Sequence, residues 1–455
     1  MKTEREHFSS RFAVIMAMAG SAIGLGNIWR FPYMVGQYGG AAFIIVYIIC
    51  CFLVSLPIFL SESIIGRRGG SDIYGAMKKL SPGTRWKWAG LITIISPVLI
   101  LSYYSVVGGW SVEYLFKSLA FEFNNTPSER IPSLFSMFIS STWEPVIMHT
   151  IFLGATAGVI LGGVKKGIER FTKITIPLLF FLILIILTYS MSLPGASKGI
   201  DYLVKPDFSK LSAEAVAAAM GQSFFSMSLG VGTILIYASY ISKKENILVS
   251  GVGTAVSDLI FALLAGFAIM PAVFASGVEP DAGPGLVFQT LPFIFNKMGA
   301  GVPWVSAVIA IVFFVTILVA ALTSSISMME AAVAYLVDEK KMKRNKATAV
   351  IFIVAWSIGV LCSLSFGPLS GVKILGETIF NFLDKLVSNY LMAIGGLIFT
   401  IFVGWVMDRS SVYDELVSGG AAKTNRPLLG SVYFLIRYVA PIAIVVIFVT
   451  NLLNP

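Results

Sequence analysis

The sequence is a succession of long apolar stretches separated by short polar ones. A membrane-spanning helix needs roughly 20 predominantly apolar residues to cross the hydrocarbon core, and eleven stretches come close to that length. We therefore expect eleven transmembrane helices. Their approximate ranges are 12–36, 41–66, 88–119, 144–162, 169–190, 213–240, 247–275, 303–337, 347–364, 374–406 and 428–452.

Glycines interrupt the first of these stretches, around the sequence SAIGLGNIWRFP. Gly20, Gly24 and Gly26 fall within seven positions, and each costs a helix interior about 1 kcal/mol relative to alanine. Asn27 and Arg30 follow at a depth where polar groups need a partner or a cavity. These features predict a helix that is broken so that its freed backbone groups bind a ligand.

The sixth stretch repeats this pattern about 205 residues later, with Ser226, Ser228, Gly230 and Gly232 at mid-membrane depth. Glycine-interrupted spans at matching places in two halves are typical of inverted-repeat transporters with their site at the breaks. The predicted fold class is an all-α integral membrane protein with a 5+5 inverted repeat and discontinuous helices 1 and 6. The predicted units are a polar segment at 1–11, repeats at 12–190 and 213–406, and an additional eleventh helix at 428–452.

The basic residues indicate the orientation of the chain in the membrane. With the N-terminus inside, the cytoplasmic segments hold 23 Lys and Arg residues and the outer segments about eight, which agrees with the positive-inside rule. The first apolar stretch lacks a small-residue cleavage site, so we expect no cleaved signal peptide. We predict a multi-pass protein of the plasma membrane (a bacterial inner membrane) with the C-terminus outside.

Composition supports this class and excludes others. Only 13% of the residues are charged, against a usual quarter or so, and the mean hydropathy is +0.85. The net charge of +9 follows from the topology and requires no nucleic acid. Cys50, Cys51 and Cys362 lie in apolar stretches and suggest no disulfide framework, and His7 and His149 are too far apart to indicate a metal site.

No motif pairs a nucleophile with a base, so we expect no enzyme. GxxxxGK[ST] and HExxH are also absent from the sequence, so neither ATP hydrolysis nor zinc chemistry has support as an energy source or a reaction. Transport energy would then come from an ion gradient.

A few polar side chains lie inside the apolar stretches. Glu62 is costly to bury unless several donors satisfy it, and an unwound helix with free N–H groups is one source of donors. Asp258 is an isolated carboxylate in the seventh stretch, which makes it a functional candidate. Thr323 and Ser324 follow Ala320 by three and four residues, so their hydroxyls can gather with its carbonyl, although such side chains also commonly bond back within their own helix.

The first break can supply both kinds of ligand-binding group. Carbonyls of Gly20, Ala22 and Ile23 lose their helical donors and favour a hard cation. The N–H groups near Leu25 and Gly26 favour an anion. A small zwitterion taken up with Na⁺ fits this pairing, whereas a neutral sugar would leave the N–H groups unpaired.

Five segments of the chain resemble a known family. REHFSSR, SAIGLGNIWRFPY, YYSVVGGW, FFSMSLGVG and ALTSSIS together are similar to motifs of the neurotransmitter:sodium symporters, which include LeuT and the monoamine transporters. The likeness runs in order along almost the whole chain. It implies a LeuT-type fold, alternating access and transport of an amino acid with sodium.

Carried over position by position, the resemblance implies two sodium sites and one amino acid site. The first sodium site would use Ala22, Asn27, Ser226, Asp258 and the substrate carboxylate. The second would use Gly20, Ile23, Ala320, Thr323 and Ser324. The substrate would contact Ala22, Leu25, Gly26, Ile100, Tyr104, Phe225, Ser226, Ser228, Val231, Ser324 and Met328, with Phe225 and Tyr104 forming a lid toward the outside.

Departures from the family pattern narrow the substrate. Monoamine transporters carry an aspartate where Gly24 stands, so Gly24 favours a substrate with its own carboxylate. Chloride-dependent members carry asparagine and serine at the positions of Asp258 and Ala262, so we predict transport without chloride. Val231 replaces a bulkier aromatic residue, and with flexible Met328 opposite it favours a hydrophobic or aromatic amino acid.

The resemblance also implies two gates. Arg30 matches the outer gating arginine, but Val387 occupies the usual acidic position, which leaves Asp384, one turn earlier, as its partner. The inner gate would pair Arg5 with Asp338, supported by Ser239 and Tyr240.

The sequence is also compatible with two other functions. One is a proton-coupled amino acid carrier of the same architecture, in which Asp258 titrates instead of binding sodium. The other is an amino acid sensor that binds without transporting. The sequence does not specify the amino acid, the ion stoichiometry or the oligomeric state.

Overall fold

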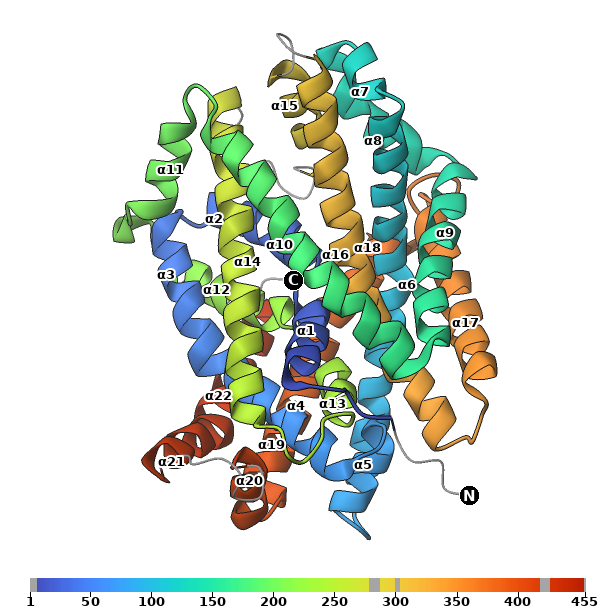
Figure 1. The fold of residues 1–455 in the computed structure, drawn as a ribbon, viewed down its shortest axis with the longest axis vertical. Helices are drawn as coiled ribbons and strands as arrows, with labels where there is room; N and C mark the ends of the chain where they lie inside the picture. The colour runs from blue at the N-terminus through green and yellow to red at the C-terminus, as the bar shows by residue number, and fades with distance from the viewer. Residues whose placement is uncertain (1–5, 278–286, 299–302, 418–425, 454–455) are drawn as a thin grey trace.

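The computed structural model describes residues 6–277, 287–298, 303–417 and 426–453. Most long helices run roughly along one axis (Figure 1). Short helices cover the two ends: α7 and α15 lie at one end, and α5, α20 and α21 lie at the other, here named the α5 end. Arg5 lies outside the described residues.

The first half of the chain is helical apart from short connections. In this notation α marks α-helices and η marks short π or 3₁₀ segments. The elements are α1 (Arg11–Ala22), η1 (Gly26–Arg30), α2 (Phe31–Gln37), α3 (Ala41–Cys50), η2 (Cys51–Ser55), α4 (Leu56–Gly69), α5 (Ile73–Leu80), α6 (Trp86–Leu119), α7 (Glu122–Asn125), η3 (Ser128–Arg130), α8 (Ile131–Ser140), α9 (Glu144–Leu161), η4 (Val164–Glu169), α10 (Arg170–Met191) and α11 (Ala196–Val204).

The second half adds one small hairpin to the helices. Its elements are η5 (Phe208–Lys210), α12 (Ala213–Ser226), α13 (Thr233–Ala238), α14 (Ile247–Ser276), α15 (Thr290–Met298), α16 (Pro303–Asp338), α17 (Arg344–Leu364), β1 (Lys373–Ile374), β2 (Glu377–Thr378), α18 (Ile379–Lys385), η8 (Leu386–Leu391), α19 (Met392–Ile401), η9 (Phe402–Val406), α20 (Arg409–Leu416), α21 (Arg426–Phe434), η10 (Leu435–Val439) and α22 (Ala440–Leu453).

The helices account for the expected spans. Among the described residues, nine helices are long and apolar enough to cross a membrane, and the bent pair formed by 11–22 and 26–37 makes a tenth. The remaining expected span, 213–240, is divided between α12 and α13, which are separated by residues 227–232. Neither of these two helices is long enough to cross a membrane alone.

Both breaks lie where glycine and polar residues interrupt the apolar pattern. In the first span α1 ends at Ala22, Ile23 is extended (φ −69°, ψ 109°), and the axis bends by 55° before the next helical segment. In the sixth span Gly230 (φ +79°) and Gly232 (φ +72°) adopt the left-handed conformation that glycine tolerates best. The prediction of discontinuous helices 1 and 6 is confirmed.

The expected start of the tenth span at 374 is wrong. Strand β1 pairs antiparallel with β2 through a two-residue turn, Leu375 (φ +51°) and Gly376 (φ +87°). Two central residues with positive φ form the tight turn that matches the twist of a hairpin. The helix therefore begins only at Ile379, after Thr378 caps it by accepting a hydrogen bond from the Asn381 N–H.

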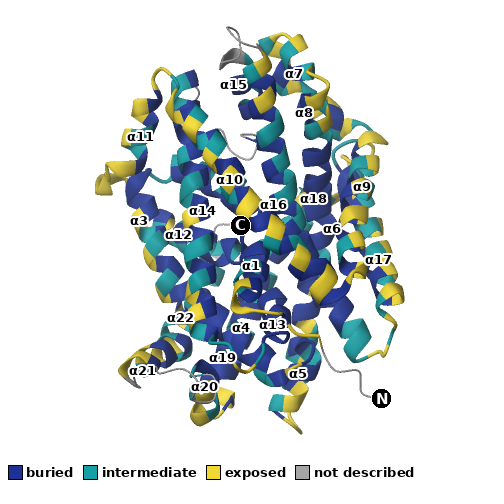
Figure 2. Ribbon diagram, in the orientation of Figure 1, coloured by how far each residue is buried: buried dark blue, intermediate teal, exposed yellow. Residues whose placement is uncertain are grey.

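The broken helices lie inside the bundle. The two longest helices, α6 and α16, pack against each other, and α1 packs against α14 and α16. Buried residues fill the middle of the molecule, and exposed ones lie mostly on the outer helices and at the ends (Figure 2). Consequently the backbone groups freed at the breaks face other helices rather than lipid.

Candidate substrate and ion site

The two breaks meet around one narrow cavity of about 30 Å³ in the middle of the molecule. All eleven residues expected to contact the substrate line it, together with Gly24 and Met392. They are Ala22, Leu25, Gly26, Ile100, Tyr104, Phe225, Ser226, Ser228, Val231, Ser324 and Met328. The structure thus brings together residues from the first, third, sixth and eighth spans.

A larger cavity of about 270 Å³, here named the outer cavity, shares four lining residues with the narrow one. These are Leu25, Gly26, Tyr104 and Phe225. The two cavities therefore meet at the Tyr104 and Phe225 side chains, which is where a lid would lie. Because the narrow cavity has room for about one water molecule, an amino acid enters only if side chains such as Phe225 move.

Asp258 forms the centre of a buried polar cluster. The Asn27 Nδ2 group donates to Asp258 Oδ1 at 2.8 Å and to Ser226 Oγ at 3.0 Å. The Ser226 hydroxyl lies 2.8 Å from Asp258 Oδ2. None of these three side chains is more than 2% exposed. The carboxylate is thus held by neutral groups, within a set of oxygen ligands that suits a hard cation.

A second cluster of oxygen atoms lies where the eighth span contacts the first break. The Thr323 hydroxyl lies 2.9 Å from the Ala320 carbonyl oxygen and 3.3 Å from that of Ile23. The Ser324 hydroxyl donates to the Ile23 carbonyl at 3.4 Å. Gly20 packs beside them, since a Cβ there would lie 3.5 Å from the Thr323 Cβ. The two hydroxyls therefore face the first break as well as their own helix.

Gly24 has no room for a side chain. A Cβ atom at this position would collide with Ser324 Oγ and lie 3.2 Å from the Tyr104 hydroxyl. The Leu25 N–H donates to the same Tyr104 hydroxyl at 3.3 Å, and the Gly24 N–H donates to Asn27 Oδ1 at 3.0 Å. The break therefore presents N–H groups and a phenol on one wall of the cavity.

Glu62 stabilises the unwound part of the sixth span. It is fully buried, and its carboxylate accepts hydrogen bonds from the Gly230 N–H at 2.7 Å and the Leu235 N–H at 3.4 Å. Hydrogen bonds to a charged group are worth about 1.5–3 kcal/mol each. The expectation that an unwound helix satisfies this carboxylate is confirmed.

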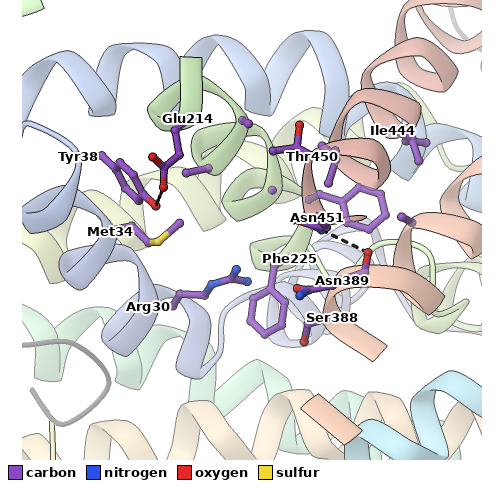
Figure 3. Close-up of a pocket in the computed structure, with 16 residues that line it drawn as sticks. Arg30, Met34, Tyr38, Glu214, Phe225, Ser388, Asn389, Ile444, Thr450 and Asn451 are labelled. Atoms are coloured by element: carbon purple, nitrogen blue, oxygen red, sulfur yellow. Dashed lines mark hydrogen bonds between the residues drawn. The ribbon is translucent and has the colours of Figure 1, made fainter. Parts of the chain in front are cut away.

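Arg30 lines both the outer cavity and a third cavity of about 200 Å³. Its guanidinium lies over the Phe225 ring, 4.6 Å from the centroid, and Figure 3 shows the two side chains at the edge of the third cavity. Asp384 also lines the outer cavity, but its carboxylate accepts from the Ser388 hydroxyl at 3.0 Å. No Arg30–Asp384 ion pair within 4.0 Å is present in the described part of the chain.

The inner gate is only partly described, because Arg5 lies outside the described residues. Asp338 accepts a hydrogen bond from the Asp72 N–H at 2.9 Å. The Tyr240 hydroxyl donates to Glu330 at 2.7 Å, and the Ser239 hydroxyl donates to the Ile236 carbonyl.

Two residues near these sites were missed by the sequence reasoning. Glu330 is fully buried and forms an ion pair with Arg344; a carboxylate inside an apolar span is a signal that could have found it. Met392 lines the narrow cavity, but one apolar residue in an apolar span carries no such signal.

Comparison with known proteins identifies the family. The model of the sodium:neurotransmitter symporter family matches residues 5–130 and 137–455. The chain belongs to this family. The family match and the apolar helices together make it a multi-pass membrane transporter.

Individual members of the family match over nearly the full length of the chain. An uncharacterized sodium-dependent transporter of Bacillus subtilis, YhdH, is 35% identical over 97% of this chain and 96% of its own. Another from Haemophilus influenzae is 34% identical over 99% and 98%. The crystal structure of MhsT in complex with L-phenylalanine is 39% identical, covers 98% of this chain and 100% of its own, and has a TM-score of 0.89. The predicted LeuT-type fold is thereby confirmed.

Proposed function

We propose that this symporter imports a hydrophobic or aromatic amino acid with Na⁺ by alternating access. The observation that carries the proposal is the narrow cavity, where both helix breaks and all eleven expected substrate residues meet. Solved MhsT holds L-phenylalanine, and similarity over the whole chain supports a related substrate here.

The backbone at the first break would hold the amino acid's carboxylate. Leu25, Gly26 and Tyr104 line the cavity, and the Leu25 N–H donates to the Tyr104 hydroxyl. Charge-assisted hydrogen bonds to a carboxylate are roughly twice as strong as neutral ones. With no side chain at Gly24, nothing competes with the carboxylate for this wall.

The apolar part of the cavity would hold the substrate side chain. Ile100, Val231 and Met328 line it, and Met392 contributes from the tenth span. Methionine is unbranched and adapts to different shapes. A large side chain would therefore fit by displacement of the two methionines rather than by filling a preformed space.

The two oxygen clusters would each hold one sodium ion. In the first, the ligands would be Ala22, Asn27, Ser226, Asp258 and the substrate carboxylate. The Asn27 Nδ2 group, rather than Oδ1, faces Ser226 and Asp258, so ligation of a cation by Oδ1 would require the amide to rotate. The ligands in the second cluster would be Gly20, Ile23, Ala320, Thr323 and Ser324. A bound cation at either cluster would link the first span to the sixth, seventh or eighth and so favour one conformation.

Chloride would not be required, because Asp258 provides a fixed negative charge. Ala262, one turn further along α14, is fully buried and has no hydroxyl with which to bind an anion. The nearest polar partners of Asp258 are the neutral Asn27 and Ser226 side chains. No Lys or Arg among the described residues forms an ion pair with Asp258. A cation bound beside the carboxylate would therefore balance its charge.

The gates and the orientation complete the proposal. Phe225 and Tyr104 would close the cavity from outside, with Arg30 and Asp384 approaching across the outer cavity. Arg5 and Asp338, with Tyr240, would close the opposite end. The α5 end would face the cytoplasm of a bacterial inner membrane, because the basic residues concentrate in the connections assigned to that side; the repeats would span 12–190 and 213–406.

Thermal unfolding of the purified protein, screened across the amino acids in NaCl, sodium gluconate and choline chloride, tests the proposal. We expect aromatic or large aliphatic amino acids to raise the unfolding temperature in both sodium salts and not in choline. Uptake into proteoliposomes under the same conditions distinguishes transport from sensing. If the rise in unfolding temperature with an amino acid depended on proton concentration across a pH series and not on sodium, a proton-coupled carrier would be favoured.

A further inference from the structure

A shallow apolar groove of about 680 Å³ lies on the surface between the tenth and eleventh spans. Its floor and walls are apolar and partly exposed; Ile442, for example, is 64% exposed. The apolar lining residues are Leu397, Ile401, Pro441, Ile442, Val445 and Val446. Arg437 also lines the groove; it lies in η10, directly after α21, one of the short helices of the α5 end (Figure 1).

Arg437 is held where two π segments, η9 and η10, face each other. Gly404 allows this close approach, since a Cβ atom there would lie 3.0 Å from the Arg437 Cα. The Trp405 indole N–H donates to the Arg437 carbonyl at 3.2 Å, and the Tyr433 hydroxyl donates to the Gly404 carbonyl at 3.0 Å. Single π turns inside helices often mark functional sites, and this pair fixes the direction of the arginine stem.

The Arg437 guanidinium has aromatic neighbours, and no described residue offers it an anionic partner within 4.0 Å. Its central carbon lies 4.4 Å from the Trp405 ring centroid and 5.5 Å from that of Tyr438. A guanidinium has five donors, yet one hydrogen bond is formed, to the Tyr433 hydroxyl at 3.4 Å, and the buried Nε has no acceptor in the described part of the chain. A long arginine side chain near the end of a membrane helix extends its guanidinium toward the interface, where anionic lipid head groups lie.

Arg409 adds a second positive charge beside the same ring. The Arg409 guanidinium lies 5.4 Å from the centroid of the Tyr433 ring, and the Arg437 guanidinium lies 5.9 Å from the same centroid. Arg409 also bonds to the Tyr413 hydroxyl at 3.0 Å. Neither arginine has a carboxylate within 4.0 Å among the described residues. Two unbalanced guanidinium groups thus lie with tryptophan and tyrosine, the residues that mark a membrane interface.

We propose that this groove binds an anionic phospholipid of the cytoplasmic leaflet. Its phosphate would lie against Arg437 and Arg409, and one acyl chain would lie along the groove between α19 and α22. Arginine binds phosphate through paired, charge-assisted hydrogen bonds, and basic pockets between helices on the cytoplasmic side are typical lipid headgroup sites. The assignment to the cytoplasmic leaflet rests on the orientation proposed above. The lipid site itself does not depend on which substrate is transported.

A second copy of the chain fits the groove less well. In a two-fold symmetric dimer across this surface, each residue contacts the same patch of its partner. Such a contact would bring the Arg437 side chains of both copies into one interface, where no carboxylate of the described residues lies within 4.0 Å of either. Charge complementarity therefore favours the lipid.

Photocrosslinking of the full chain in phosphatidylcholine vesicles tests this site. Trace phosphatidylglycerol or phosphatidylcholine, each with a photoreactive acyl chain, would label peptides from 397–406 and 437–446. We expect phosphatidylglycerol to label these peptides about fivefold more than phosphatidylcholine, since one basic residue near the surface contributes about that factor. Arg437→Gln should remove most of this preference, because Arg437 lines the groove itself.

Matched variants distinguish this site from general surface charge. Arg85→Gln removes one exposed arginine from the same end of the bundle and should leave the ratio unchanged, while Arg409→Gln should lower it partially. If Arg437→Gln fails to fold, the Arg409→Gln result decides. Equal labelling by both lipids in the wild type, equal loss in Arg85→Gln, or no labelling of these peptides by either probe would overturn the proposal.

Discussion

Replacing Asp258 by asparagine separates charge from shape at the first proposed sodium site. Asparagine has almost the same volume and can still accept a hydrogen bond from Ser226, which lies 2.8 Å from the aspartate. The carboxylate is fully buried, so the substitution removes its negative charge from a place that water does not screen. We expect the fold to persist and sodium binding to weaken.

The magnitude follows from the distance between charges. A monovalent cation about 4 Å from the carboxylate is attracted by about 4 kcal/mol at an effective dielectric constant of about 20. Each 1.4 kcal/mol corresponds to about tenfold in affinity, so Asp258→Asn should weaken sodium binding by about two to three orders of magnitude. The double variant Asp258→Asn, Ala262→Ser should recover sodium binding in chloride and not in gluconate, because an anion then replaces the lost charge.

Sodium titrations of the unfolding temperature, in chloride and in gluconate at a saturating amino acid concentration, measure both effects. Glu214→Gln is the control, since it removes a carboxylate that lines the third cavity instead of the ion clusters. Sodium affinity of Asp258→Asn within threefold of the wild type in gluconate would refute the role of Asp258. A chloride requirement in the wild type would refute the proposal that its charge replaces chloride.

Three further predictions concern other parts of the structure. Gly24→Ala forces a Cβ against Ser324, an overpacking of about 1–3 kcal/mol, and equilibrium binding should show an amino acid affinity at least about fivefold weaker; unchanged affinity would mean that this wall is not part of the site. Thr323→Val removes one oxygen ligand from the second cluster at nearly constant volume, and the Hill coefficient for sodium should fall from about 2 toward 1; an unchanged coefficient would remove Thr323 from the ion site. Burial, reinforced by the nearby Asp338 charge, raises the pKa of Asp72 from 3.8 to about 7, so the folded state favours the protonated form and loses stability as the pH rises through this range. Acidification from pH 8 to 6 should therefore raise the unfolding temperature, and this rise should be smaller in Asp72→Asn; an equal rise in both would assign it to other groups.

The breaks in helices 1 and 6 could be predicted because their physical cause is visible in the sequence. Glycine with polar neighbours inside an apolar stretch is unfavourable in a continuous helix, and Gly230 does adopt a positive φ. The gathering of the substrate residues could not come from periodicity, because they lie on four spans far apart in sequence; motif similarity suggested it, and the cavity brings these residues together. Their assignments to substrate and sodium remain predictions.

Other features have no pattern that reveals them in advance. Ile374 and Leu375 are apolar, as the first residues of a membrane helix would be. Leu375 and Gly376 nevertheless have positive φ, which a right-handed helix does not allow. The π segments at 402–406 and 435–439 arise from a shift in backbone hydrogen bonding, which depends on packing between helices more than on residue type. The relation of Arg30 to Asp384 depends on how far two helices stand apart, a distance that sequence spacing does not define.

The hydrogen bonds that Glu62 accepts from the sixth span affect how tightly the transporter can bind its cargo. Gly230 and Leu235 donate to a carboxylate that belongs to α4, so the open backbone of the sixth span is satisfied by the protein itself. Cargo therefore does not have to unwind a helix on arrival, and the ordering cost of this wall is met when the chain folds. Pre-organisation of this kind converts more of the contact energy into affinity, so a small ligand with few contacts can still be held firmly.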